Sequence, residues 1–328
     1  MKEIVFIHKN KKKWERFEQV LQKGYKVAPD ELSALFIQLN EDLAYSRTYY
    51  PQSSITSYLN ALTQKAYSVI YRNKPVTTNK IIKFWKHDYP LLFYSIRKEV
   101  LYSFLVFFIA ALIGVLSTHY DPEFPRVILG DQYVNMTLDN MEKGDPMAVY
   151  KSMEQLPMFL GISMNNIYVS FIAFLFGCFT ALGTGFLLLQ NGIMLGTFQY
   201  FMIQKGFFVE STSTIWIHGT LEIFSIIVAG AAGIVLGNSI VFPKSYSRGV
   251  SFRKGAAKGG KVIFGLIPVF IMAGFIEGFI TRYTQAPYVL KLSVIIISLA
   301  FIVYYYVILP NLLIKQSKNK NNGNTYPI

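Results

Sequence analysis

The stretch that decides the fold is IWIHGTLEIFSIIVAGAAGIVLG, residues 215–237. It exceeds the roughly 20 apolar residues that a helix needs to cross a bilayer, yet it contains His218 and Glu222. A second stretch, KVIFGLIPVFIMAGFIEGFIT at residues 261–281, contains Glu277. An ionisable side chain at the bilayer centre costs about 2.5 to 3.5 kcal/mol on insertion scales, so it usually faces protein or a polar cavity. The sequence therefore indicates a membrane protein that holds polar groups among its helices.

Composition agrees with this class. Hydrophobic residues make up 52% and aromatic residues 16% of the 328 residues, more than an ordinary soluble domain contains. Six segments have the length and apolar character of transmembrane helices: residues 101–118, 167–189, 192–209, 215–237, 261–281 and 291–310. We therefore predict an all-α fold, a polytopic membrane helix bundle of about six spans with an N-terminal cytosolic helical domain.

The net charge of +13 is distributed as in a membrane protein, so we predict no nucleic-acid partner. Residues 1–98 contain 17 Lys and Arg against 8 Asp and Glu, and the loop 238–261 contains six bases and no acid. The loop 119–166 contains seven acids and three bases. Because cytoplasmic loops are enriched in Lys and Arg, both termini and loop 238–261 are predicted inside and loop 119–166 outside. A re-entrant segment at 192–209 would move loop 238–261 outside, so we count it as a span.

The chain divides into three predicted parts: a cytosolic helical domain at 1–98, the transmembrane bundle at 99–314 and a basic polar tail at 315–328. In the first part, apolar residues recur at helical spacing: Trp14, Phe17, Val20 and Leu21, then Leu32, Leu35, Phe36, Leu39 and Leu43. Its end, residues 77–99, mixes aromatics with bases and is predicted as a helix in the headgroup region. The alternative is an ordinary helix of the cytosolic domain. The single cysteine, Cys178, excludes an intramolecular disulfide.

Small residues recur at four-residue spacing in the predicted spans. The rows are Gly177, Ala181 and Gly185; Gly192 and Gly196; Ala229, Gly233 and Gly237; Gly274 and Gly278. Lipid provides no hydrophobic drive for helices to associate, so close backbone approach along such rows is how they pack. We interpret the rows as a packing signal for a compact bundle.

The ionisable residues of the spans are predicted to meet in the outer leaflet. His218 and Glu222 lie near the outer end of the fourth span, on its small-residue face, and Glu277 lies near the outer end of the fifth. Two further groups are expected at that level: Asn165 and Asn166 at the start of the second span, and His119 at the end of the first. Asn191 and Gly192 are expected in a polar turn at the cytoplasmic end.

Three interpretations of this cluster remain open. It could be a hydrogen-bonded tie between helices, or a proton- or substrate-linked pocket of the kind found in transporters. It could also hold a divalent metal ion through His218, Glu222 and Glu277, with His119 as a further candidate ligand. The sequence contains no phosphate-binding loop, zinc-protease motif or nucleophile elbow, so no catalytic residue is assigned.

The order and spacing of several motifs resemble the stage II sporulation protein M family. They are LNEDLAYSRTYYP (39–51), NNIYVSFIAFLFG (165–177), LLQNGIMLG (188–196), IHGTLE (217–222), AGAAGIVLG (229–237) and AGFIEGFIT (273–281). The resemblance covers about residues 30–310 and implies a multipass protein of the bacterial inner membrane, whose namesake works with cell-wall hydrolases during engulfment. By matching position, the family's polar pattern falls on Asn166, Asn191, Gly192, His218, Gly219, Glu222 and Glu277.

The function expected from these observations is a non-enzymatic scaffold in the bilayer that positions envelope-remodelling or other membrane proteins and can form a homo-oligomer. One alternative is a transporter or flippase-like protein that uses the outer polar pocket. The other is an intramembrane metalloenzyme. No cofactor is predicted beyond the candidate divalent metal.

Overall fold

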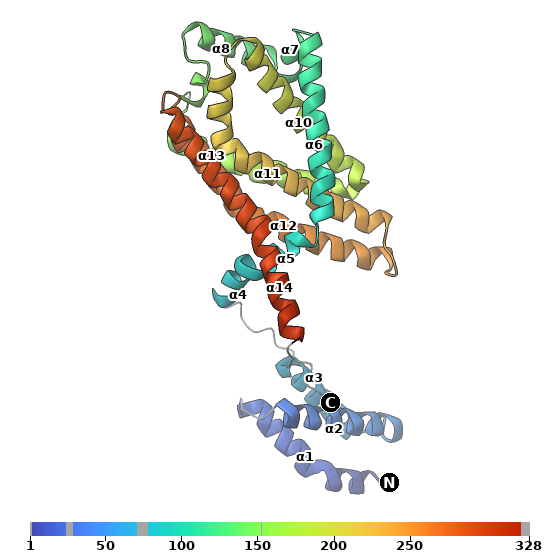
Figure 1. Ribbon diagram of the computed structural model, residues 1–328. Coiled ribbons are helices and arrows are strands. Elements are labelled where there is room, and N and C mark those ends of the chain that lie inside the picture. The colour runs from blue at the N-terminus through green and yellow to red at the C-terminus, as the bar shows by residue number, and fades with distance from the viewer. Residues whose placement is uncertain (1, 24–28, 71–77, 152, 323–328) are drawn as a thin grey trace. The chain divides into compact units, whose positions relative to one another are not determined.

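The computed structural model describes residues 2–23, 29–70, 78–151 and 153–322. Every regular element in these ranges is a helix, which confirms the predicted all-α class. The chain forms two compact units, residues 1–77 and residues 78–328 (Figure 1).

The first unit contains three helices: α1 (Glu3–Lys23), α2 (Pro29–Tyr49) and α3 (Ser54–Ile70). Its buried core includes Trp14, Phe17, Leu21, Leu39 and Leu43, which the helical spacing predicts. The remaining buried residues of the core are Phe6, Ile55, Leu59, Leu62 and Ala66. The indole of Trp14 is buried and donates a hydrogen bond to Asp42 Oδ2 at 2.8 Å, which satisfies its one polar atom.

The second unit begins with a short helical segment and contains all the membrane-length helices. Its elements are α4 (Thr78–Lys83), η1 (Phe84–Asp88), α5 (Tyr89–Tyr94), α6 (Arg97–Tyr120), α7 (Phe124–Leu129), α8 (Asp131–Glu142), η2 (Ala148–Lys151), α9 (Gln155–Leu175), η3 (Phe176–Phe179), α10 (Thr180–Gln204), α11 (Phe208–Val241), α12 (Arg248–Phe275), η4 (Ile276–Thr281), α13 (Tyr288–Ile302), η5 (Val303–Ile308) and α14 (Leu309–Asn322).

Residues 78–96 belong to this second unit and not to the N-terminal domain in which we placed them. Tyr89 and Ile96 are fully buried in the core of the unit, and the Tyr89 ring fills the space over Gly265 of α12. The Tyr305 hydroxyl donates a hydrogen bond to the Trp85 carbonyl at 2.6 Å. The aromatic residues of this segment therefore serve to dock it on the transmembrane helices, a role that composition does not distinguish from membrane-surface binding.

Five helical stretches in the described residues are long and apolar enough to cross a membrane, where hydropathy predicted six spans. They are Arg97–Tyr120, Gln155–Gln204, Phe208–Val241, Arg248–Thr281 and Tyr288–Ser317. The difference lies in the second stretch, which contains two helices, α9 and α10, joined through the 3-10 segment η3.

Helices α9 and α10 run in opposite directions. The Thr184 hydroxyl donates a hydrogen bond to the Ala173 carbonyl at 3.0 Å, and further along, Val169 and Asn191 line one small cavity. The reversal occurs at Thr180, whose φ of 68° is unusual for a residue with a Cβ. The turn predicted at Asn191–Gly192 is therefore wrong, because both residues lie inside α10.

Helix α11 is the centre of the second unit. In the most apolar part of α11, 67% of the residues are buried inside the protein. The corresponding shares are 22% in α6 and 11% in the C-terminal stretch Tyr288–Ser317. Small residues make this burial possible: a Cβ on Gly233 would overlap Thr184 of α10, and one on Gly237 would lie 2.5 Å from the Ala181 backbone nitrogen. These approaches confirm the predicted use of the row on α11 in packing.

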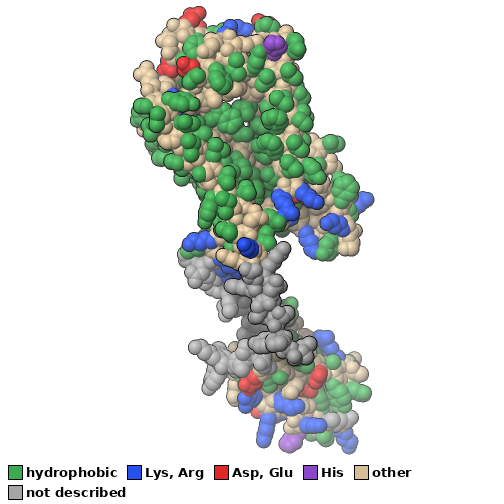
Figure 2. All heavy atoms as spheres, in the orientation of Figure 1, with side chains coloured by type: hydrophobic (Ala, Val, Ile, Leu, Met, Phe, Trp, Pro, Cys, Tyr) green, Lys and Arg blue, Asp and Glu red, His purple; other side chains and the backbone are tan. Residues whose placement is uncertain are grey.

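Charged residues separate to the two ends of this unit (Figure 2). One end contains the basic residues of α12, and there Lys258 Nζ donates a hydrogen bond to the Ser95 carbonyl at 3.4 Å. The other end contains the acidic segment 121–154, where the Thr284 hydroxyl donates a hydrogen bond to Asp145 Oδ2 at 3.4 Å. Apolar side chains cover the surface between these ends, as expected for a belt in contact with lipid. The arrangement supports the prediction that the basic end is cytoplasmic.

The orientation can be tested by cysteine labelling in intact cells. In a Cys178→Ser background, Lys143→Cys is expected to react with a membrane-impermeant maleimide and Arg253→Cys only after the cells are permeabilised, because the charge distribution predicts that the basic end faces inside. Both positions are exposed, so access within the protein is matched. Labelling of position 253 in intact cells would contradict the orientation.

Candidate functional site

Helices α11 and η4 bring three ionisable side chains together. His218 and Glu222 lie one turn apart on α11, and Glu277 projects from η4. His218 Nε2 is 3.7 Å from Glu277 Oε2, and one ligand atom from each of the three residues lies within 4.8 Å of the others. His218 is 4% exposed. The convergence that the sequence predicts is therefore present in the structure.

Thr281 fixes the orientation of the His218 ring. Its hydroxyl donates a hydrogen bond to the Ile276 carbonyl at 3.3 Å and lies 3.1 Å from His218 Nδ1. Because the hydroxyl donates its one proton to the Ile276 carbonyl, it can only accept from the imidazole, so Nδ1–H is the donor to Thr281. The lone pair of Nε2 then faces Glu277. The π-helical geometry of η4 puts Glu277 and Thr281 on the same side. Such π segments occur often at functional sites.

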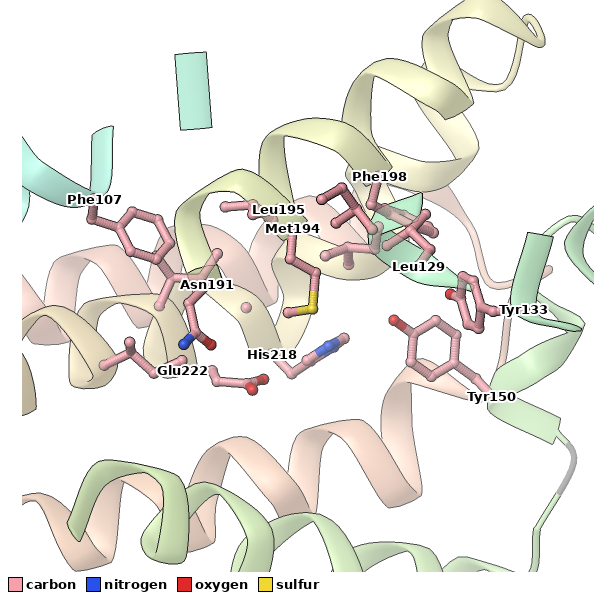
Figure 3. A pocket seen from close by; sticks show the side chains of 15 residues that line it. Phe107, Leu129, Tyr133, Tyr150, Asn191, Met194, Leu195, Phe198, His218 and Glu222 are labelled. Carbon is pink, nitrogen blue, oxygen red and sulfur yellow. The ribbon is translucent and has the colours of Figure 1, made fainter. Parts of the chain in front are cut away.

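A cavity of about 380 Å³ opens beside His218 and Glu222 (Figure 3). Its walls come from α6, α7, α8, η2, α10 and α11, with apolar side chains over most of the surface and Asn191 on the α10 side. A second cavity of about 370 Å³ reaches Glu277. Tyr133 and Tyr150 line both cavities and separate them.

Tyr150 of η2 lies over the histidine. The two ring centroids are 5.6 Å apart and the ring planes are inclined at 65° to each other. Burial, together with the Glu277 and Glu222 carboxylates nearby, raises the pKa of the Tyr150 phenol well above its usual value. The phenol therefore stays protonated at neutral pH and can donate a hydrogen bond on the η2 side of the site.

The charges of the site are poorly compensated by protein groups. In the part of the chain that the structure describes, neither Glu222 nor Glu277 forms an ion pair with a lysine or arginine. The buried amine of Lys291 donates its hydrogen bonds elsewhere, to the Thr214 hydroxyl at 3.1 Å and to the Thr284 carbonyl at 2.6 Å. Two partly buried carboxylates near one imidazole favour either proton uptake or a bound cation.

The other predicted site residues have mixed outcomes. Asn166 is buried and its amide is directed at Glu222, whereas Asn165 is exposed. Asn191 lines the cavity instead of a cytoplasmic turn. His119 is exposed and its Nδ1 lies 2.6 Å from the Tyr200 hydroxyl, outside the group of three, so it is not a ligand candidate.

Three residues of the site were not predicted from sequence: Tyr133, Tyr150 and Thr281. Thr281 follows Glu277 by four residues, a spacing that puts both on one helix face and could have indicated it. The two tyrosines lie in the segment predicted as an extracytoplasmic loop, and no local pattern marks them. They reach the site only because α8 and η2 fold back over the helix ends.

The fold and site define a polytopic helical membrane protein with an intramembrane cavity whose mostly apolar walls contain a few polar groups. The family model for stage II sporulation protein M matches residues 103–282, more than half of the chain. The chain belongs to the stage II sporulation protein M family. A second family model, a domain of unknown function, DUF8413, matches residues 4–72, which correspond to the first unit. Neither the curated proteins nor the solved structures gave a match.

Proposed function

We propose that this protein is a membrane scaffold that recruits envelope-remodelling proteins at the bacterial inner membrane. The observation that carries the proposal is the first unit, a set of helices with its own apolar core and its own family model. This unit contributes none of the five membrane-length stretches in the described residues. Binding of a partner protein is the role that its surface supports best.

Exposed apolar side chains gather at one end of the first unit, where α1 begins and α2 ends. We call Ile4, Val5 and Tyr49 the apolar end; their exposed fractions are 81%, 53% and 61%. The rings of Phe6 and Tyr45 stack at 5.0 Å and hold these two helix ends together. Single exposed apolar residues are common, whereas a group of them is typical of a protein-binding surface.

Removal of the first unit is expected to abolish partner binding but not membrane insertion. A chain that begins at Thr78 keeps every membrane-length stretch, so it should fractionate with membranes. Co-purification from native membranes and mass spectrometry would compare its partners with those of the full chain. Retention of every partner, or failure to insert, would contradict the proposal.

A finer test uses the apolar end alone. Ile4→Glu combined with Val5→Glu changes only exposed positions, so the unit should stay folded while partner recovery falls about tenfold or more, as for the loss of a central interface contact. Lys9→Glu, at another exposed position of α1, is the matched control and should retain its partners.

The cavity beside His218 and Glu222 favours a second candidate function, transport or lipid translocation from the outer leaflet. Its volume of about 380 Å³ is that of a small-molecule site, and its polar groups lie at the end of mostly apolar walls. Uptake or lipid scrambling in proteoliposomes that is lost in Glu222→Gln would support it. Protein that is folded and correctly oriented but inactive towards every tested solute and lipid would favour the scaffold.

A further inference from the structure

We propose that His218, Glu222 and Glu277 bind one divalent transition-metal ion, for which zinc is the best match. The donor set is one imidazole nitrogen and two carboxylate oxygens, a combination that suits zinc, and its three members come from α11 and η4. This site would fasten α11 to η4 at the outer ends of the helices. The inference is independent of the scaffold role.

The spacing of the ligand atoms is close to that of a zinc site. Zinc–nitrogen and zinc–oxygen bonds of about 2.0 to 2.2 Å put tetrahedral ligand atoms about 3.3 to 3.6 Å apart. His218 Nε2 and Glu277 Oε2 are 3.7 Å apart, and all three ligand atoms lie within 4.8 Å of one another. Rotation of the two carboxylates about their side-chain bonds is enough to close the remaining distance.

The imidazole is already in the form that a metal needs. The Thr281 hydroxyl oxygen accepts a hydrogen bond from His218 Nδ1–H, which leaves the Nε2 lone pair directed at the carboxylates. A hydrogen bond to the second ring nitrogen is the usual means by which a protein orients a histidine ligand. Thr281 is fully buried, so water does not compete for this bond.

Charge gives a further reason for a cation. With the imidazole neutral and both carboxyl groups ionised, the three ligands carry a total charge of −2, which zinc would cancel. Burying that charge without a partner costs several kcal/mol per ion. The structure supplies no lysine or arginine ion pair to either glutamate within the described ranges.

Asn166 provides an independent observation. Its side chain is 6% exposed and lies beside Glu222, yet Nδ2 makes no hydrogen bond of normal geometry among the described residues. An unsatisfied buried donor costs about 1 to 3 kcal/mol. A small movement of Glu222 onto a metal would let its second oxygen accept from this amide, which is the usual support for a ligating carboxylate.

The fourth coordination position is directed towards the cavities. His218 and Glu222 line the first cavity (Figure 3) and Glu277 lines the second, so an exchangeable oxygen ligand could enter from either. Three protein ligands with one open position distinguish such a site from a closed structural one. Tyr150, whose ring lies against His218, is placed to hydrogen-bond that oxygen ligand.

The test is metal binding by the full-length protein in detergent or nanodiscs. After treatment with a chelator and dialysis, wild-type protein is expected to take up one Zn²⁺ per chain, measured by elemental analysis and calorimetry. His218→Ala, Glu222→Gln and Glu277→Gln should each bind at least tenfold more weakly, and Thr281→Val about 10- to 100-fold more weakly. The matched controls are His119→Ala and Glu210→Gln, which remove an exposed histidine and an exposed glutamate near the same end.

X-ray absorption on the zinc-loaded wild type keeps the test valid if a site variant fails to fold. One imidazole, oxygen ligands and no sulfur are expected. Uptake below about a tenth of an equivalent by folded wild type, equal affinity in folded site variants, equal loss in the controls, or two or more imidazoles at the metal would each overturn the proposal.

Discussion

Gly196→Leu is expected to prevent the transmembrane unit from folding. Helices α6 and α10 touch backbone to backbone: a Cβ at Gly196 would overlap the Ala111 carbonyl, and one at Gly192 would lie 2.5 Å from the Phe107 carbonyl oxygen. Backbone cannot move aside as a flexible side chain can. The cost should therefore reach or exceed the roughly 3 kcal/mol at the upper end for overpacked cores.

Gly185→Leu is the matched control, since Gly185 lies on the same helix and a Cβ there would meet nothing within 4 Å. Its stability should change by no more than about 0.5 kcal/mol. Size-exclusion profiles and thermal melts in detergent would measure both variants. Equal behaviour of the two would show that the α6–α10 contact does not determine folding.

The second large effect is expected at the polar cluster, with a chelator present so that only protein contacts are measured. His218→Ala and Glu277→Ala should each lower the melting temperature, because either change leaves buried polar partners unsatisfied at about 1 to 3 kcal/mol. Their double mutant should differ from the sum by about 0.5 to 3 kcal/mol, since the two side chains are 3.7 Å apart.

Substitutions at Glu222 separate shape from charge. Glu222→Gln keeps the side-chain volume and a polar end group, so its melting temperature should stay near that of the wild type, whereas Glu222→Ala removes both and should lower it. The exposed pair His119→Ala and Glu210→Ala is the additive control. Strict additivity at His218 and Glu277 would falsify a shared site.

Residues of the first unit show how much a local pattern can predict. Trp14, Phe17 and Leu39 were placed in a core from helical spacing alone, and all three are buried. Spacing is sufficient there because a short amphipathic helix has only one apolar face to bury. The convergence of His218, Glu222 and Glu277 was also predictable, since each side chain had to avoid lipid and all lay near the same end.

Asn191 and Gly192 show where this reasoning fails. Their residue types suggest a turn, but Asn191 satisfies its amide on the Leu187 carbonyl at 2.8 Å and Gly192 makes room for α6. Asn191 therefore lines a cavity, and Gly192 allows α6 to cross close to α10. Both residues lie within one continuous helix. The chain reverses instead at Thr180, which no local signal distinguishes.

By itself, the sequence determined the all-helical membrane class, the amphipathic helices of the first unit and the residues that would avoid lipid. These properties depend on hydropathy and on the period of a single helix. Only the tertiary structure decided the position of the α9–α10 turn, the docking of residues 78–96, the tyrosines over the site and the lone pair that His218 directs at Glu277. Those features depend on contacts between residues far apart in the chain, and the energy of such contacts is set by the packed arrangement as a whole.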